Sequence, residues 1–391
     1  MSPQFAKLDE VAETSSGGTP SRGNKGLYGG EIPWIKSGEL PDGEITEVGE
    51  SITQLGLDNS SAKLLPAGTL VIAMYGATVG KLGILTFPAA TNQAVCAIVP
   101  SERLHRDYLF YWLLMIRSRL IDKSFGGAQP NISQTVIRDL EIPLIEVEEQ
   151  ARIAGYIKCQ LTEVETARQA TVDQLRDAAA LKSKALESIF TGIPKSKAIG
   201  TVANVQSGYA FKSDTFKTSG VRLLRNANIL PGQVYWEDQV FLSEEDSEPF
   251  KSYELNDGDV LISLDRPIIS SGIKVARVGA VDLPALLLQR VGRFLIDPDQ
   301  LDADYLYAYL QTQMFISAIS GHDQSLGVPH ISPTQVENVE IPLPDVTSQK
   351  KLSKQLNEVA REWQVIRSAI QAQLADLTTL PNAILAQAFE S

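Results

Sequence analysis

The chain has 391 residues, 43% of them hydrophobic and 21% charged, which excludes a largely disordered chain and leaves room for two or three domains. Its net charge of −12 excludes a basic surface over the whole protein, the usual feature of a chain that binds nucleic acid on its own. Two cysteines, Cys96 and Cys159, exclude a disulfide framework, and the three histidines show no zinc-ligand spacing. Because the sequence lacks a membrane-spanning apolar run and a signal-peptide core, we expect a soluble, cytoplasmic protein.

Short strands and a short helix are predicted in the first part of the chain. Apolar runs bounded by Gly, Pro, Asn and Ser predict strands at 32–36, 69–74 and 95–99, and an amphipathic helix follows at 108–121. Residues 148–190 contain no proline and one glycine, so they predict one long helix. The second part repeats this order, with strands at 221–225, 259–264 and 291–296, a helix at 305–319 and a long helix at 347–389.

The two parts of the chain are a tandem duplication. Residues 130–150 match residues 329–349 without a gap at 10 of 21 positions, in a register of 199. The match includes the Glu-Ile-Pro-Leu segments at 141–144 and 340–343 and the glutamines Gln150 and Gln349. Upstream, Ser16-Gly17 parallels Ser207-Gly208. Each half therefore contains a strand-rich domain followed by a long helix.

Each long helix carries apolar residues at alternating spacings of four and three. This heptad pattern is regular from Leu352 to Ile384, and it is interrupted in the first helix by Arg168 and Lys182. A helix of about 40 residues is about 60 Å long at 1.5 Å per residue. Each helix could simply pack on its own globular domain, but an apolar seam of this length favours pairing with another long helix.

The sequence contains no recognisable active site. Gly76 to Lys81 resembles a phosphate-binding loop, but only three residues separate Gly76 from Gly80, and Leu82 follows the lysine where Ser or Thr is required. No dinucleotide-binding glycine motif, nucleophile elbow or histidine-based triad is present. We therefore expect no catalysis by this chain.

The chain resembles the DNA-specificity subunits of type I restriction–modification systems. The resemblance covers essentially all 391 residues. It is carried in the first half by residues 8–12, Gly17-Gly18-Thr19-Pro20, residues 32–40, Gly76-Ala77-Thr78-Val79-Gly80-Lys81, Asn92-Gln93, Pro130-Asn131-Ile132-Ser133 and Ile142-Pro143-Leu144. It is carried in the second half by residues 207–211, residues 223–229, Pro329-His330-Ile331-Ser332 and Ile341-Pro342-Leu343. The second half departs from the pattern where Asp265-Arg266-Pro267 replaces Tyr75-Gly76-Ala77.

The resemblance implies an α+β fold that repeats a target recognition domain and a spacer helix. The domains would be 1–147 and 194–346, and the helices, 148–193 and 347–391, would pair as an antiparallel coiled coil. Each domain would read one half of a bipartite double-stranded DNA site. Two modification subunits, which carry S-adenosylmethionine and methylate adenine, and restriction subunits would be the partners, with no cofactor or metal on this chain. The candidate partner-binding residues are Ile157, Leu161, Val164, Leu175, Leu356, Val359, Trp363, Ile366 and Ile370.

Candidate DNA-contacting residues are chosen from the loops that follow predicted strands. Arg and Lys can read guanine, and Asn and Gln can read adenine, through paired hydrogen bonds to base edges. In the first domain the candidates are Lys36, Ser37, Tyr75, Thr78, Lys81, Asn92, Gln93, Gln129 and Asn131. In the second domain they are Tyr209, Lys212, Arg225, Asn226, Asn228, Arg266, Gln289, Arg290 and His330. Trp34 and Trp236 are expected to be core or interface aromatics.

The charge distribution leaves a second interpretation open. Residues 1–147 carry 12 Lys and Arg against 16 Asp and Glu, and residues 194–346 carry 12 against 20. Neither domain is basic, so a DNA-contacting surface must be local, and the isolated chain should bind DNA weakly. The alternative is a coiled-coil scaffold with two β domains that bind ligands other than DNA. The acidic charge favours that alternative, and the loops rich in Asn, Gln and Arg favour DNA.

Overall fold

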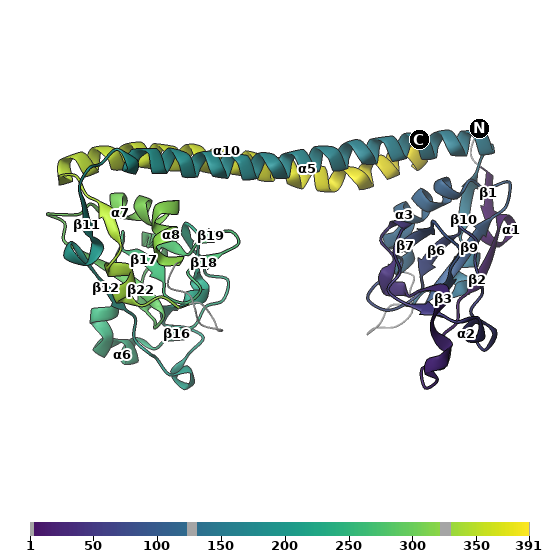
Figure 1. The fold of residues 1–391 in the computed structure, drawn as a ribbon, viewed down its shortest axis with the longest axis horizontal. Helices are drawn as coiled ribbons and strands as arrows, with labels where there is room; N and C mark the ends of the chain where they lie inside the picture. The colour runs from purple at the N-terminus through teal and green to yellow at the C-terminus, as the bar shows by residue number, and fades with distance from the viewer. Residues whose placement is uncertain (1–3, 123–130, 321–329, 391) are drawn as a thin grey trace. The chain divides into compact units, whose positions relative to one another are not determined.

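A computed structural model describes residues 4–122, 131–320 and 330–390, and these residues form two compact units (Figure 1). Unit 1 consists of Met1–Ala170 and Gln373–Ser391, and unit 2 consists of Thr171–Ala372. Unit 1 therefore contains the first predicted domain together with the C-terminal end of the chain. The boundaries between units fall inside the two long helices.

Unit 1 is built around a five-stranded sheet in the order β2-β9-β6-β7-β4. These strands are β2 (Ala12–Ser16), β9 (Val95–Pro100), β6 (Leu70–Ala73), β7 (Leu82–Leu85) and β4 (Gly43–Ile45). The smaller sheets are β5 (Ser51–Ile52) with β3 (Tyr28–Ile35) and β8 (Ala90–Thr91), and β1 (Gln4–Lys7) with β10 (Glu141–Leu144). The helices are α1 (Leu8–Val11), α2 (Gln54–Asp58), α3 (Arg106–Asp122) and α4 (Gln134–Arg138).

Unit 2 repeats this plan with a four-stranded central sheet in the order β12-β22-β17-β20. These strands are β12 (Ala203–Ser207), β22 (Val291–Ile296), β17 (Val260–Ser263) and β20 (Val275–Arg277). The smaller sheets pair β16 (Phe241–Leu242) with β13 (Val221–Leu224) and β21 (Ala285–Leu287), β11 (Ser196–Ala198) with β23 (Glu340–Pro342), β14 (Ile229–Leu230) with β15 (Gln233–Val234), and β18 (Ile268–Ile269) with β19 (Gly272–Ile273). The short helices are α6 (Glu244–Ser247), α7 (Ala303–Leu310), α8 (Gln313–Ser320) and α9 (Pro333–Glu337).

The long helices α5 (Val147–Thr191) and α10 (Val346–Glu390) each have 45 residues. In unit 2 the end of α5 pairs with the beginning of α10. Leu186 and Phe190 of α5 share a core with Leu356 of α10, and the Lys182 ammonium lies 6.0 Å from the centre of the Trp363 ring. In unit 1 the beginning of α5 shares a core with Leu385 near the end of α10. Within each unit the two helices therefore run antiparallel.

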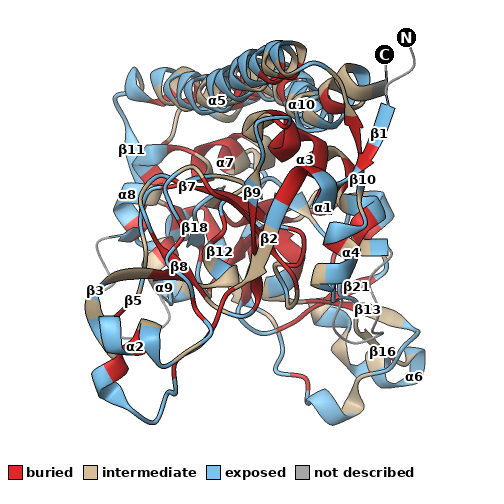
Figure 2. Ribbon diagram, turned by 90° about the vertical axis from the view of Figure 1, so that its right-hand side faces the viewer, coloured by how far each residue is buried: buried red, intermediate tan, exposed pale blue. Residues whose placement is uncertain are grey.

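The C-terminal end of each long helix packs on the domain that precedes the other long helix. Phe389 of α10 lies 5.1 Å, between ring centres, from Tyr108 of α3, and Phe190 of α5 lies 5.1 Å from Tyr305 of α7. Phe190 and Phe389 are separated by the repeat register of 199 residues. Buried residues are concentrated in the central strands and in α3 and α7 beneath these helix ends (Figure 2). The core of unit 1 is therefore completed by the last helix of the chain, and the core of unit 2 is completed by the first long helix.

The repeated glutamines fix the start of each long helix. Gln150 and Gln349 are fully buried. The Gln150 side chain accepts a hydrogen bond from the His105 backbone N–H (2.8 Å) and donates to the carbonyls of Arg103 (3.0 Å) and Ile145 (2.8 Å). Gln349 makes the same three hydrogen bonds in unit 2, to the backbone of residues 302, 300 and 344. A buried amide is stable only when its polar atoms are paired, which explains why the residue is shared by the two halves.

Other repeated residues also have structural roles. Ile132 and Ile331 are buried, while Ser133 and Ser332 accept hydrogen bonds from backbone N–H groups at the N-termini of α4 and α9. A side chain on Gly17 or Gly208 would collide with the backbone oxygen of residue 91 or 288. These motifs therefore shape the scaffold of each unit.

The predicted strands and long helices are confirmed, but one predicted helix is wrong. The strands expected at 32–36, 69–74, 95–99, 221–225, 259–264 and 291–296 correspond to β3, β6, β9, β13, β17 and β22. The helix expected at 305–319 is broken into α7 and α8. The break occurs because the Thr312 hydroxyl donates to the Tyr309 carbonyl (2.7 Å) and accepts from the Phe315 N–H (3.3 Å), which caps the start of α8. In the described ranges, none of the helices is long and apolar enough to cross a membrane.

Candidate nucleic-acid interface

Four chain segments meet at one end of the strands in unit 1. Strand β3 runs parallel to β8, so both end on the same side, and the Asn92 N–H donates to the Ile35 carbonyl (2.9 Å). The Met74 N–H donates to the Ala94 carbonyl (2.8 Å), and the Ile132 N–H donates to the Met74 carbonyl (2.7 Å). These hydrogen bonds place residues 35–37, 92–94, 74–76 and 131–132 side by side. We call this group of segments the loop edge of unit 1.

The loop edge of unit 1 brings together most of the predicted DNA-contacting residues of the first domain. Gln93 and Asn131 are exposed, and Lys36, Ser37, Tyr75 and Asn92 are half-buried. The Gln93 side chain accepts a hydrogen bond from Thr19 and also hydrogen-bonds to Tyr75, whose pKa is raised mainly by burial. Thr78 and Lys81 lie in the turn between β6 and β7, where the Lys81 N–H donates to the Thr78 carbonyl (3.0 Å). Gln129 lies outside the described residues.

The positive charge at the loop edge of unit 1 is partly neutralised. The Lys36 ammonium lies 3.4 Å from Glu50 and 3.9 Å from Glu39. The pKa of the Glu50 carboxyl is lowered by its hydrogen bonds from Arg22 and then from Lys36. Within the part of the chain that the structure describes, the exposed Lys81 forms no ion pair with a carboxylate. The polar groups exposed along this edge are therefore mainly hydroxyls and amides, with Lys81 as an exposed cation.

Unit 2 has the same loop edge, made by the same backbone hydrogen bonds. The Leu288 N–H donates to the Leu224 carbonyl (3.1 Å), the Leu264 N–H to the Arg290 carbonyl (2.8 Å) and the Ile331 N–H to the Leu264 carbonyl (3.0 Å). The loop edge of unit 2 therefore comprises residues 224–226, 288–290, 264–266 and 330–331. It borders a hollow of about 490 Å³ that is lined by Gln289, Arg290 and His330.

Charged side chains form a cluster at this second edge. The Arg290 guanidinium lies 3.3 Å from one carboxylate oxygen of Asp265, and the His330 ring lies 3.3 Å from the other. Arg290 and His330 are about half exposed, while the Asp265 side chain is 18% exposed. Asp265 was not among the predicted residues. The sequence signal for it was the departure of Asp265-Arg266-Pro267 from the first repeat.

Asn228 was predicted to contact DNA, and the structure corrects this prediction. Its side chain is buried, with 1% exposed. Its carbonyl oxygen accepts from the Arg225 N–H (3.1 Å), and its amide donates to the carbonyls of Tyr235 (3.0 Å) and Asp238 (2.9 Å). The equivalent residue in unit 1 is Glu39, which accepts from the Lys36 N–H (2.8 Å). Asn228 is therefore a structural residue that shapes the loop, because its polar atoms are already paired with backbone.

The neighbouring candidates are partly engaged within unit 2. Arg225 forms an ion pair with Asp238 (2.8 Å) and its side chain is 23% exposed. Asn226 accepts from the buried Lys274 ammonium (2.5 Å), whose pKa is lowered mainly by burial. The candidates that remain exposed are Tyr209, Lys212, Arg266 and Gln289, and backbone hydrogen bonds place Tyr209 beside Gln289. The Tyr209 ring packs on the Phe250 ring, with 4.5 Å between ring centres. The Gln289 N–H donates a hydrogen bond to the Tyr209 carbonyl (2.9 Å).

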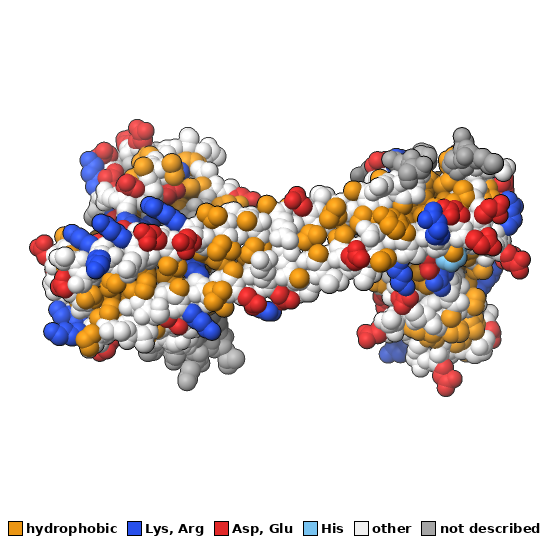
Figure 3. All heavy atoms as spheres, turned by 90° about the horizontal axis from the view of Figure 1, so that it is seen from above, with side chains coloured by type: hydrophobic (Ala, Val, Ile, Leu, Met, Phe, Trp, Pro, Cys, Tyr) orange, Lys and Arg blue, Asp and Glu red, His pale blue; other side chains and the backbone are white. Residues whose placement is uncertain are grey.

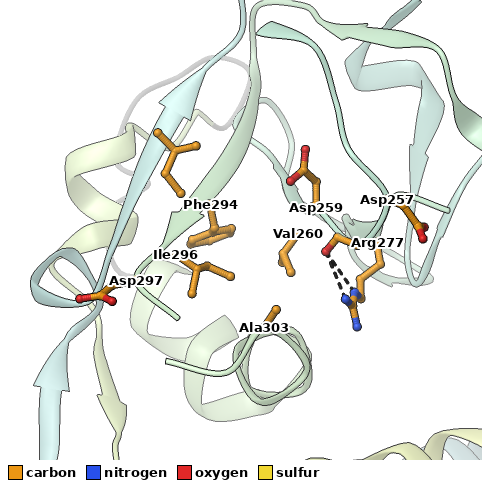
Figure 4. Close-up of a pocket in the computed structure, with 10 residues that line it drawn as sticks. Asp257, Asp259, Val260, Arg277, Phe294, Ile296, Asp297 and Ala303 are labelled. Atoms are coloured by element: carbon orange, nitrogen blue, oxygen red, sulfur yellow. Dashed lines mark hydrogen bonds between the residues drawn. The ribbon is translucent and has the colours of Figure 1, made fainter. Parts of the chain in front are cut away.

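A larger hollow of unit 2, about 650 Å³, lies away from the loop edge (Figure 4). Asp257, Asp259 and Asp297 line it. Its cation, Arg277, donates to the Gly258 carbonyl (3.3 and 3.2 Å) and pairs with Asp304. Three carboxylates would repel DNA phosphates, so this hollow does not fit a nucleic acid. Among the described residues, no group of three His, Cys, Asp or Glu side chains is arranged to hold a metal ion.

The predicted partner-binding residues on the long helices divide into two groups. Ile157, Leu356 and Ile370 are buried within this chain, and Leu161 and Val359 pack against the same cores. Ile157, Leu356 and Ile370 are too buried within this chain to contact a partner in this structure, while the partner-binding role of the half-buried Leu161 and Val359 stays a prediction. Ile366 remains 47% exposed, while Val164, Leu175 and Trp363 are half-buried. Exposed apolar residues that the sequence did not single out include Leu181 and Val365, at 67% and 70% exposure.

Comparison with known proteins supports two copies of one module. The family model described as "Type I restriction modification DNA specificity domain" matches residues 3–174 and again 195–375. The chain is 30% identical over 299 residues to the type I restriction enzyme MjaVIII specificity subunit of Methanocaldococcus jannaschii, covering 72% of this chain and 68% of that protein. It is 38% identical over 191 residues to the EcoAI specificity subunit of Escherichia coli, which covers 48% of this chain and 32% of that protein. The match to EcoAI therefore spans about a third of that relative.

Two solved structures share the fold. A chain from structural work on complex assembly and conformational transition of the type I R-M system superposes with a TM-score of 0.78 at 18% identity, covering 99% of this chain and 97% of that chain. The HsdS subunit of Thermoanaerobacter tengcongensis superposes with a TM-score of 0.59 at 20% identity, covering 99% of this chain and 96% of that chain. At these identities the similarity establishes the fold alone.

Proposed function

The chain belongs to the type I restriction modification DNA specificity family, and from this premise we propose that each of its two units reads one half of a bipartite site in double-stranded DNA. The observation that carries the proposal is the loop edge, which is built twice by equivalent backbone hydrogen bonds. The shared backbone positions side chains, and the side chains on it differ between the units. This is what two different half-sites would require, because base readout depends on side-chain chemistry.

The chain itself would be non-catalytic, with the chemistry on partner chains. Methylation would be performed by two modification subunits that hold S-adenosylmethionine, and cleavage by restriction subunits. Because the net charge of −12 opposes DNA binding by this chain alone, the partner subunits would have to supply much of the phosphate neutralisation. These substrates and partners place the protein in the cytoplasm.

Exposed apolar residues on the long helices offer a docking surface for the modification subunits. They include Tyr156 and Leu380 in unit 1, and Val172, Leu181, Val365 and Ile366 in unit 2. Hydrophobic side chains line the outer face of α5 and α10 in both units (Figure 3). Contiguous exposed apolar surface of this kind is typical of protein–protein contacts. The helices would also set the spacer between the half-sites.

The assembly is tested by co-expressing the chain with its modification subunit. We expect one copy of this chain with two modification chains by native mass measurement, and adenine methylation within one bipartite sequence by genome-wide mapping. A double variant, Leu181→Asp with Val365→Asp, should abolish the complex because buried carboxylates oppose apolar docking. The exposed polar substitution Gln174→Asp on the same helix serves as the matched control. A complex of another stoichiometry, or methylation without a bipartite sequence, would contradict the proposal.

A further inference from the structure

Four of the differences between the two loop edges change the charge or hydrogen-bonding chemistry of the middle of the edge. The backbone hydrogen bonds align Met74 with Leu264, Ala94 with Arg290 and Ile132 with Ile331. Tyr75 and Asn131 of unit 1 form an isolated β-bridge, and Asp265 and His330 form the equivalent bridge in unit 2. Unit 1 therefore has Tyr75, Gly76, Ala94 and Asn131 where unit 2 has Asp265, Arg266, Arg290 and His330. At these four positions, uncharged residues in unit 1 are replaced by charged or titratable residues in unit 2.

Both arginines at the second edge have a backbone conformation that favours glycine. Arg266 has φ of 46° and Arg290 has φ of 68°. Among the described residues, Asp42 is the one other non-glycine residue with positive φ. At the position equivalent to Arg266, unit 1 has Gly76, with φ of 88°. Arg266 also precedes Pro267, which further restricts its backbone.

The backbone fold of unit 2 does not require an arginine at the positive φ of Arg266. The Arg266 side chain is exposed, and glycine occupies the same backbone conformation in unit 1 without cost. Strained non-glycine residues persist mainly at sites where the side chain is needed for function. The positive φ of Arg266 therefore points to a use for its exposed side chain.

Asp265 orients Arg290 toward the open side of the edge. Its carboxylate lies 3.3 Å from Arg290 and 3.3 Å from His330, while its own side chain is mostly buried. A buried cation, Lys274, lies near the same carboxylate and donates to Asn226 (2.5 Å). Fixing one side of a guanidinium leaves its other N–H groups free for a planar acceptor pair, such as O6 and N7 of guanine.

We propose that Arg290 and Arg266 read guanine in the half-site of unit 2, with Asp265 as the positioning residue. The inference rests on the proposed function, since it names the base class that this same surface recognises. Unit 1 lacks an arginine at the equivalent positions and would read its half-site through Gln93, Asn131 and Tyr75. The two units would therefore read their half-sites with different kinds of side chain.

The first test uses Arg290→Ala in the complex with the modification subunits. We expect the methylated sequence to lose its requirement for one guanine in one half-site, by roughly 5- to 150-fold, while the other half-site stays the same. Gln93→Ala should relax the opposite half-site, which assigns the halves to the units. Arg361→Ala removes an exposed arginine from α10 of unit 2 and should leave both half-sites unchanged.

The second test separates the role of Arg266 from its strain. Arg266→Gly introduces the residue found in unit 1, so we expect the melting temperature to rise by about 2–4 °C while guanine discrimination falls. A higher melting temperature with an unchanged methylation pattern would overturn the role of Arg266. A lower melting temperature would overturn the assignment of strain.

The third test concerns Asp265 as a positioning residue. Asp265→Asn should relax the same guanine as Arg290→Ala, and the double variant should be no worse than Arg290→Ala alone, because Asp265 acts through Arg290. Additive losses would overturn the positioning role. If the wild-type complex methylates no bipartite site, the proposed function fails. If it does and Arg290→Ala keeps every base preference, the inference fails and the proposed function stands.

Discussion

At the residue scale, a side chain's partners decide whether it is available for recognition. Asn228 and Arg290 are both polar residues in loops of unit 2. Asn228 is buried, and three backbone hydrogen bonds occupy its amide. Arg290 is about half exposed and is held on one side by Asp265. Residue type alone could not distinguish them, because hydrogen-bond partners depend on the folded environment.

Lys182 carries a half-buried charge between the long helices of unit 2, and its removal should stabilise the unit. The pKa of the Lys182 ammonium is lowered mainly by burial, and the positive charge of Arg367 lowers it further. The compensating contacts are the Trp363 ring at 6.0 Å and the Gln311 oxygen at 3.4 Å. Because the folded state disfavours the protonated lysine, the free energy of unfolding should increase as pH rises through the lowered folded-state pKa toward the unfolded value.

Lys182→Met keeps the length of the side chain and removes the charge. We expect the melting temperature at neutral pH to rise by about 2–4 °C, and the difference from wild type to shrink as pH approaches the ordinary lysine pKa. Thermal unfolding monitored by circular dichroism from neutral to alkaline pH measures both effects. Lys184→Met, at an exposed position two residues further along α5, should change neither. A destabilised Lys182→Met would mean that the contact with Trp363 outweighs the cost of burial.

At the element scale, the long helices complete domains that are distant in sequence. Phe389 packs on Tyr108 and on Trp112, whose ring centre lies 5.3 Å away. Phe389→Ala should therefore destabilise unit 1 by about 3 kcal/mol, a typical cost of removing a packed phenylalanine. Unit 2, which contains the first part of the same helix, should be unaffected.

Hydrogen exchange measured by mass spectrometry separates these outcomes. After Phe389→Ala, exchange should increase in α3, β1 and β10, while β17 and β22 keep their protection. Phe190→Ala should give the reciprocal result in unit 2, because Phe190 packs on Tyr305. Leu380→Ala shortens an exposed apolar side chain of α10 and serves as the control for introducing alanine into this helix. Increased exchange in both units after Phe389→Ala would show that the units do not unfold separately.

At the scale of the whole molecule, the length of the long helices should control the DNA spacer. Adding four residues to a helix adds about 6 Å, close to two base pairs at 3.4 Å each. Lengthening α5 immediately after Gln150 would displace Ala154 and Ile157 from the core of unit 1. The extra turn therefore belongs between Ala170 and Thr171 in α5, and between Ala372 and Gln373 in α10, where the units divide.

Genome-wide methylation mapping of this lengthened variant measures the spacer directly. We expect a longer non-specific spacer with both half-site sequences unchanged, since neither loop edge is altered. The DNA also turns by about 70° over two base pairs, at 10–10.5 base pairs per turn, so activity should fall unless the protein or DNA twists to follow. A control with four alanine substitutions at exposed helix positions should keep the original spacer. A new half-site sequence with the original spacer would contradict the helix-length model.

The sequence by itself determined the duplication, the central strands of each unit, the two long helices and the family. These follow from local patterns, such as the register of 199, the heptad spacing and the absence of proline in the first long helix. Helix and strand periodicity is a local property, so one sequence suffices to detect it. The sequence could also point to the loops that carry Gln93, Arg266, Arg290 and His330.

Only the tertiary structure decided which of these residues meet and which are already paired. It showed that α10 completes unit 1, that Asn228 is structural, and that Asp265 holds Arg290 and His330. It also showed that the helix at 305–319 is broken and that Ile157, Leu356 and Ile370 of the long helices are buried within the chain. These facts depend on contacts between residues far apart in the chain, and no local pattern encodes which distant partner will fill a given position.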